Sequence, residues 1–273
     1  MATHGSAFPI AKLALNNNVP PILMASLRMG LVMLILIPFW KFKIPEKKYL
    51  KSLVIFSVSM GVMVYVFMNL SLKHSSFISP IIIGAQLAVP FAVLLSAVMI
   101  GENISSKKWM FVILAFIGIV IVFFDPELKN NLLGLFFASL MALFFAIAQV
   151  YSRQLKELSL TLINAYTGFF GFFVLIVVSF FLEGELVFNI KNINLESWIL
   201  IGYQAVIVSL FAHMSMFYLY KFYTVGQIFP FYSLFPIFGI ILTFFIFGEV
   251  PSVLFFIGSF IVISSVILLQ KTK

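Results

Sequence analysis

The chain has no cysteine among its 273 residues. Disulfide frameworks, thiolate zinc sites, iron–sulfur clusters and cysteine nucleophiles are therefore excluded for this sequence. Charged residues are also scarce, at 10% of the chain, whereas soluble domains carry about 25%. Apolar residues make up 63%, and the mean hydropathy is +1.16. This composition excludes a soluble globular domain and predicts a chain that lies within a lipid bilayer.

Catalytic sequence motifs are absent as well. The sequence contains no H-E-x-x-H, no G-x-S-x-G, no P-loop and no dinucleotide-binding fingerprint. Ser105 and Lys108 have the spacing of a serine–lysine pair, but they lie in a short polar loop, and we interpret the match as coincidence. All nine acidic residues fall in loops or at the ends of apolar runs, which argues against proton coupling through a buried carboxylate. The sequence therefore predicts that the protein is not an enzyme and needs no cofactor.

Long apolar runs fill most of the chain. A helix needs roughly 20 residues to cross the ~30 Å core of a bilayer. Nine runs meet this length, at approximately 21–40, 50–72, 77–100, 107–124, 131–152, 160–182, 197–219, 226–247 and 252–270. The three tryptophans fall at the ends of these runs, where indole rings prefer the membrane interface. The expected fold class is an all-α polytopic membrane protein.

The first 15 residues hold a shorter apolar stretch, interrupted by Pro9 and Lys12. We interpret this stretch as a tenth span that is shorter than the others. Either the start codon lies upstream of Met1, which is the preferred interpretation, or the first helix crosses only half of the membrane. The sequence therefore predicts about ten transmembrane helices, the first of them short.

Basic residues are distributed unevenly between the two sides of the membrane that these spans define. Of the 17 lysines and arginines, twelve fall on the side that also holds the C-terminus, four fall on the opposite side, and Arg28 lies inside a span. Because cytoplasmic loops are enriched in lysine and arginine, the side with twelve is expected to be cytoplasmic. The net charge of +8 then reflects topology rather than nucleic-acid binding. We expect a multi-pass protein of the bacterial cytoplasmic (inner) membrane with a cytoplasmic C-terminus.

The two halves of the chain share a sequence pattern. Residues 90–102 run from a proline through an apolar stretch to a Gly-Glu pair, and residues 236–249 repeat this order 146 residues later. We therefore expect two repeats of five spans each, at residues 1–125 and 131–270. Because five is an odd number, the repeats must cross the membrane in opposite directions. Inverted repeats place a substrate site near the middle of the membrane, between the two halves.

Three features of the sequence resemble one transporter family. They are His4 to Lys12, with the order His-Gly-Ser-Ala-Phe-Pro-Ile-Ala-Lys, then Ala25 to Arg28, with the order Ala-Ser-Leu-Arg, and the two Pro…Gly-Glu segments. Together they resemble the EamA type of the drug/metabolite transporter (DMT) superfamily, although His4 stands where the family often has tryptophan. The resemblance implies two five-helix repeats and a metabolite carrier, commonly an exporter of amino acids or related compounds. It also implies that the fifth and tenth spans are peripheral.

Arg28 is the most informative candidate for substrate binding. A guanidinium inside an apolar span is costly unless it faces a partner or a wet cavity. With Lys12 from the short first helix, it would give the outer half of the path a positive lining suited to a carboxylate or phosphate. Alternatively, Arg28 snorkels outward or pairs with an external acid such as Glu249 or Glu185.

Polar side chains inside the other spans are further candidates for substrate binding. Such groups either bridge neighbouring helices or face the transport path. The preferred ones are Gln86 and Tyr232, because they precede Pro90 and Pro236 on repeat-related spans. The remaining candidates are Asn69, Gln149, Tyr203 and His213.

Several of these residues also have a purely structural interpretation. His213 could relay protons, but a neutral histidine packed between helices is the preferred interpretation. Pro90 and Pro236 could act as hinges, although plain kinks that aid packing are preferred. Glu102 and Glu249 are expected to cap a helix or hold a turn locally, and a gating role is the alternative.

The function expected from the sequence is transport. We expect a carrier that exports a small polar metabolite, an amino acid or a related compound, by alternating access. Two alternatives stay open: an importer of a nucleotide-like or S-adenosylmethionine-like metabolite with the same fold, and a membrane-embedded enzyme or non-transporting membrane subunit. The expected partners are a small-molecule substrate and the lipid bilayer, without nucleic acid or a metal ion, and a homodimer stays open.

Overall fold

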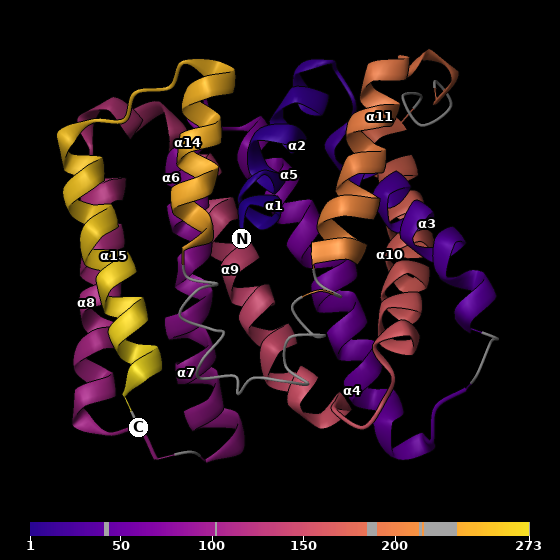
Figure 1. Ribbon diagram of the computed structural model, residues 1–273, viewed down its shortest axis with the longest axis horizontal. Helices are drawn as coiled ribbons and strands as arrows, with labels where there is room; N and C mark the ends of the chain where they lie inside the picture. Colours follow the sequence, from indigo (N-terminus) through magenta and orange to yellow (C-terminus); the bar gives the residue numbers. More distant parts are fainter. Residues whose placement is uncertain (41–43, 102, 185–189, 213–214, 216–233, 273) are drawn as a thin grey trace.

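A computed structural model describes residues 1–40, 44–101, 103–184, 190–212, 215 and 234–272. This part of the chain is helical, and no strand is found in it (Figure 1). Eight of its helices are long and apolar enough to cross a membrane, and Phe235–Phe247 is a shorter apolar helix. The predicted all-α polytopic membrane fold is confirmed.

The first half of the chain forms the expected short helical segment followed by longer helices. Its elements are α1 (Ala2–Gly5), α2 (Ala7–Asn16), α3 (Pro21–Trp40), α4 (Lys47–Val58), the π-helical segment η1 (Ser59–Met63), α5 (Val64–Lys73), α6 (Ser79–Gly84), the 3₁₀ turn η2 (Ala85–Leu87), α7 (Ala88–Ile100) and α8 (Ser106–Phe123). The third and fourth spans are thus each built from two α-helical pieces joined by a different helix type.

The second half repeats this arrangement where the structure describes it. Its elements are η3 (Pro126–Asn131), α9 (Leu132–Ser152), η4 (Arg153–Leu155), α10 (Leu160–Glu183), α11 (Leu195–Tyr203), the π-helical segment η6 (Gln204–Ala212), α14 (Phe235–Phe247) and α15 (Val253–Lys271). The ninth apolar run expected from the sequence, at 226–247, is described only from residue 234 onward, and there it forms α14.

Local sequence chemistry determines several helix ends. At the N-termini of α8, α10, α11 and α15, a serine or asparagine side chain accepts a hydrogen bond from the backbone N–H three residues further on. At their C-termini, α7 and α14 stop at Gly101 and Gly248, whose φ angles of 73° and 66° suit glycine best. These are the glycines of the two Gly-Glu pairs, so the repeated sequence motif marks a repeated helix end.

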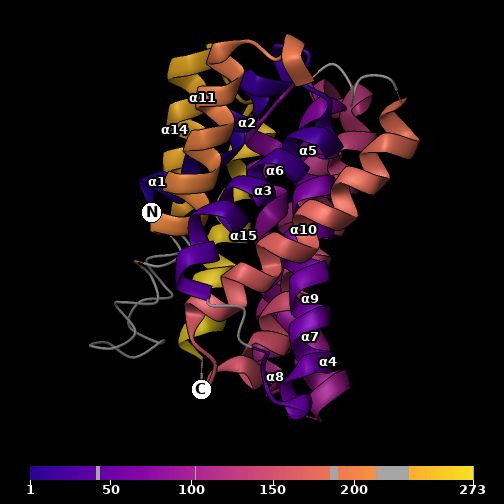
Figure 2. The same ribbon diagram turned by 90° about the vertical axis from the view of Figure 1, so that its right-hand side faces the viewer.

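Helix pairs drawn from opposite halves hold the molecule together. α8 packs against α15, and α3 packs against α10. A Cβ atom added to Gly118 would lie 2.8 Å from Cγ2 of Val262, and one added to Gly258 would lie 2.6 Å from Cγ2 of Val122. Such reciprocal contacts are typical of equivalent helices related by a two-fold axis. Figure 1 shows α8 and α15 side by side, and Figure 2 shows the same bundle from the side.

Candidate substrate-binding site

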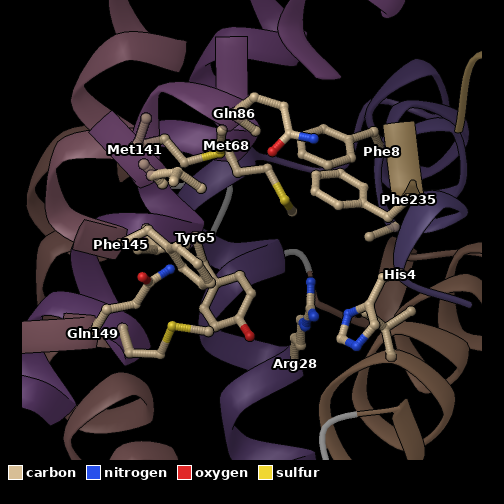
Figure 3. A pocket seen from close by; sticks show the side chains of 18 residues that line it. His4, Phe8, Arg28, Tyr65, Met68, Gln86, Met141, Phe145, Gln149 and Phe235 are labelled. Atoms are coloured by element: carbon tan, nitrogen blue, oxygen red, sulfur yellow. The ribbon is translucent and has the colours of Figure 1, made fainter. Parts of the chain in front are cut away.

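A cavity lies inside the bundle, with helices of both halves around it (Figure 3). It encloses about 740 Å³ of space free of atoms, part of it at its open mouth. Most of the lining is apolar, with alanine, valine, methionine and phenylalanine side chains. The polar and aromatic–polar lining residues are His4, Arg28, Tyr65, Gln86 and Gln149.

Two π-helical segments contribute to this lining. Met60 comes from η1 and Val208 from η6, and these segments lie in corresponding spans of the two halves. A π-helical turn holds more residues than an α-helical turn, and such turns are frequent at functional sites. The next residue of η6, Ser209, contacts Arg28 directly. The irregular turns thus bring side chains of both halves to the cavity.

Arg28 is held at the cavity by two contacts from different helices. Its side chain is only 3% exposed. Nε donates a hydrogen bond of 2.9 Å to Oγ of Ser209, and Cζ lies 4.1 Å from the centroid of the Tyr65 ring. Nη1 is buried and has no hydrogen-bond partner in the described part of the chain. Arginine stays charged in proteins, so the cavity wall carries a fixed cation with a spare donor.

Aromatic and methionine side chains form the other walls. The rings of Phe8 and Phe235 are stacked, with centroids 6.4 Å apart and planes 8° from parallel. Met68, Met141 and Phe145 also line the cavity. Figure 3 shows the Phe8–Phe235 pair close to the Gln86 side chain, with Arg28 next to Tyr65 and His4. The site therefore combines one strong cation with a mostly apolar, polarizable surface.

Three of the candidates from the sequence line this cavity together. Arg28 comes from α3, Gln86 from the 3₁₀ turn between α6 and α7, and Gln149 from α9. They are far apart in the sequence, and helix packing brings them to one space. Their roles in binding stay predictions.

Lys12 lies outside the cavity lining. Its ammonium donates hydrogen bonds to the backbone oxygens of Leu72, at 2.6 Å, and Ser75, at 2.7 Å. Leu72 lies in the last turn of α5, where carbonyl groups have no partner within the helix, and Ser75 follows the helix. Lys12 therefore joins the short N-terminal helix to the end of α5. The sequence predicts a positive cavity wall made by Lys12 and Arg28 together, but of these two residues only Arg28 lines the described cavity.

Glu249 is engaged away from Arg28. Its two carboxylate oxygens accept hydrogen bonds from the backbone N–H groups of Ile78, at 2.7 Å, and Ser79, at 2.9 Å. These groups start α6, so Glu249 caps a helix of the other half of the chain. The alternative in which Glu249 pairs with Arg28 does not match this geometry. Glu185, the other acid considered for that pairing, lies outside the described residues, as does Glu102.

Two other candidates also bridge helices. The Asn69 side-chain amide donates a hydrogen bond of 2.8 Å to the backbone oxygen of Pro21, and the Tyr203 hydroxyl lies 2.8 Å from Oγ of Ser6. Neither residue lines the cavity. Their side chains tie α5 to α3 and α11 to the N-terminal segment, which is the helix-bridging role of polar groups in membranes.

The two candidate hinge prolines lie at helix starts. Pro90 is the third residue of α7, and Pro236 is the second residue of α14. Pro236 stands where an N–H group would have no partner within the helix, so it fits there without breaking a hydrogen bond. Pro90 follows the 3₁₀ turn η2 inside the continuous fourth span, so it lacks an N–H that could bond the carbonyl four residues earlier. Their proposed role as hinges stays a prediction. His213 and Tyr232 lie outside the described residues.

Sequence reasoning missed several residues that form the cavity. Tyr65, Phe8 and Ser209 are ordinary members of apolar runs, and nothing in their local sequence separates them from residues that face lipid. His4 carried a signal, because it departs from the tryptophan frequent in the resembling family. The contacts of Arg28 with Ser209 and Tyr65 span 181 and 37 positions of the chain and arise only from packing.

Comparison with known proteins supports this architecture. The model of the EamA-like transporter family matches residues 1–124 and 132–270. One solved crystal structure is similar over 97% of this chain and 95% of its own, with a TM-score of 0.52 and 15% sequence identity. At that identity the likeness shows the fold alone. Among curated proteins, no match to the sequence is found.

Proposed function

Because the chain belongs to the EamA-like transporter family and is thus a membrane transporter of the drug/metabolite superfamily, we propose that it carries a small polar metabolite by alternating access. The substrate class we propose is an amino acid or a related compound, and the direction is export. The two repeats would alternate between states in which the cavity opens to one side of the membrane and then to the other.

The observation that carries this proposal is the position of Arg28. A buried arginine with a spare donor is costly inside a membrane protein, and such residues mark substrate paths. Arg28 lies at a cavity that elements of both halves surround, with Gln86 and Gln149 in the same lining. A site between the two halves is where rocking of one repeat against the other would change access.

The orientation we propose follows from the charge distribution. The side with twelve basic residues, including the C-terminus, would face the cytoplasm of a bacterial cell, and the protein would lie in its cytoplasmic membrane. Export then corresponds to uptake into everted membrane vesicles.

Transport by the purified protein tests the proposal. The protein is reconstituted in proteoliposomes, and counterflow is measured with a panel of amino acids, keto acids, nucleotides and S-adenosylmethionine. We expect saturable flux for at least one amino-acid-like compound, and accumulation of it in everted vesicles. Flux of nucleotide-like compounds alone would support the importer alternative, and turnover of a compound without any flux would contradict transport.

Paired arginine variants connect the flux to the cavity. Arg28→Gln should reduce flux by about tenfold or more, because it removes a charged hydrogen-bond donor. Arg153→Gln is the matched control, since Arg153 is exposed and lies outside the cavity lining. If Arg28→Gln transports as well as Arg153→Gln at equal amounts of folded protein, the cavity is not the substrate site.

A further inference from the structure

The described lining of the cavity carries positive charge without negative charge. Arg28 is its one permanently charged residue, and no aspartate or glutamate is among the described lining residues. No ion pair of Arg28 with an acid is found in the part of the chain that the structure describes. A buried charge without a partner is unfavourable, so a bound anion would compensate Arg28. The ammonium group of a zwitterion would find no carboxylate here and would lose its hydration.

The guanidinium is also oriented before any ligand binds. Ser209 accepts a hydrogen bond from Nε, and Cζ of the guanidinium lies over the Tyr65 ring. Nη1 is left as a buried donor without an acceptor in the described residues. A ligand oxygen that accepts a hydrogen bond from the guanidinium would add an acceptor to this group with little loss of side-chain freedom. A ligand with one carboxylate or similar anionic group would supply such an acceptor together with the negative charge that compensates Arg28.

The rest of the cavity suits a flat apolar body. The stacked rings of Phe8 and Phe235 offer an aromatic surface, and Met68, Met141 and Phe145 add polarizable contacts. Aromatic rings gain from stacked or edge-to-face contacts with other rings, and from contacts with thioether sulfur. A small, strongly hydrated anion such as a dicarboxylate would leave these surfaces without a partner.

From these observations we propose that the cavity selects a monovalent organic anion with an aromatic body, in preference to a zwitterion or a cation of the same shape. The head would bind the guanidinium of Arg28, and the ring would pack against the Phe8–Phe235 pair. This inference rests on the proposed function as a carrier, and it narrows the amino-acid-related substrate class to aromatic acids without an ammonium group.

A ligand series on the unmodified protein tests the charge preference. Isothermal titration calorimetry of the purified full chain compares 3-phenylpropionate, phenylalanine and phenethylamine, which share a ring but differ in charge. We expect 3-phenylpropionate to bind at least about tenfold more tightly than the other two, because only it matches the charge of the lining. Equal or tighter binding of phenylalanine or phenethylamine would overturn the proposal.

Variants then assign the two ends of the ligand. Arg28→Gln should weaken 3-phenylpropionate binding by about tenfold or more, and Arg28→Lys, which keeps the charge but loses the planar fork, should weaken it less. Arg153→Gln should bind as the unmodified protein does. Unchanged affinity in both Arg28 variants would overturn the assignment of the head group.

The ring preference has its own control. The affinity ratio of phenylacetate to cyclohexylacetate measures the preference for an aromatic body. Phe8→Leu should reduce this ratio, because it removes one ring of the stacked pair. Phe181→Leu is the control and should leave the ratio unchanged, because Phe181 is 75% exposed and lies outside the lining. A ratio that Phe8→Leu leaves unchanged would overturn the assignment of the ring site.

Binding and transport results separate this inference from the proposed function. Selective binding of aromatic acids without flux in proteoliposomes would contradict the carrier and leave the ligand class standing. Flux of metabolites by a protein that binds 3-phenylpropionate no better than phenylalanine would support the carrier and overturn the ligand class.

Discussion

Lys12 shows how a charged residue of the short N-terminal helix can serve the fold. Its ammonium donates hydrogen bonds to the backbone oxygens of Leu72, in the last turn of α5, and of Ser75, just after the helix. Carbonyl groups in this position need an outside donor, because the helix supplies none. Arg28 differs, since one of its nitrogens keeps no partner among the described residues and lies at a cavity. The two basic residues therefore have different expected phenotypes.

Lys12→Met should lower stability without changing ligand affinity. The variant leaves two carbonyl groups unsatisfied, and hydrogen bonds of charged groups contribute about 1.5–3 kcal/mol each. We expect the melting temperature in detergent to fall by several degrees, because in a chain of this size a loss of about 1 kcal/mol in unfolding free energy lowers the melting temperature by about 2–4 °C. Lys12→Arg, which keeps a donor, should recover part of the loss. A variant with normal melting but weaker ligand binding would place Lys12 in the substrate site.

At the scale of helices, acidic residues of the second half hold helix starts of the first half. Glu183, at the end of α10, accepts hydrogen bonds from the backbone N–H groups of Ile22 and Leu23, and Glu249 does the same at the start of α6. Negative charge is favourable at a helix N-terminus, where N–H groups lack partners within the helix. These contacts join the two halves at positions that sequence patterns alone do not connect.

Glu183→Gln should therefore destabilise the contact between α10 and α3. An amide offers one acceptor oxygen, so one of the two backbone N–H groups loses its partner, at a cost of about 1–3 kcal/mol. Thermal unfolding followed by circular dichroism measures the loss. Glu157→Gln is a suitable control, because Glu157 is exposed and accepts a hydrogen bond from the Tyr49 hydroxyl instead of capping a helix. Equal melting temperatures for the two variants would contradict the capping role.

Glycines allow close contact where two helices cross, as Gly258 of α15 does against α8. A Cβ atom on Gly258 would lie 2.7 Å from the backbone oxygen of Gly118, so Gly258→Ala must push α15 away from α8. A Cβ atom on Gly202 would meet no other atom within 4 Å. Because alanine favours the helix over glycine, Gly202→Ala should be neutral or stabilising by up to about 1 kcal/mol. We expect Gly258→Ala to lower the melting temperature and Gly202→Ala to keep or raise it. Ligand affinity should stay unchanged in both variants, because neither glycine lines the cavity.

For the molecule as a whole, hydropathy was enough to predict the spans but not the site. Eight of the nine apolar runs correspond to described helices of membrane-crossing length, since the cost of unpaired backbone groups in lipid makes such runs helical. Arg28 could be singled out because a charge in an apolar run is costly. Phe8 and Tyr65 could not be singled out in this way, because every span contains similar side chains and only packing decides which of them face the cavity.

The orientation of the whole molecule can be tested because the chain has no native cysteine. Lys191→Cys and Lys271→Cys each introduce one thiol at an exposed position, on opposite sides of the membrane in the predicted topology. Lysine-rich segments stay in the cytoplasm during insertion, so the C-terminal position should be internal. A membrane-impermeant maleimide added to intact cells should label Lys191→Cys, and it should label Lys271→Cys only after lysis. The unmodified protein should stay unlabelled in both conditions. Labelling of Lys271→Cys in intact cells would reverse the proposed orientation and, with it, the side on which the cavity releases its substrate.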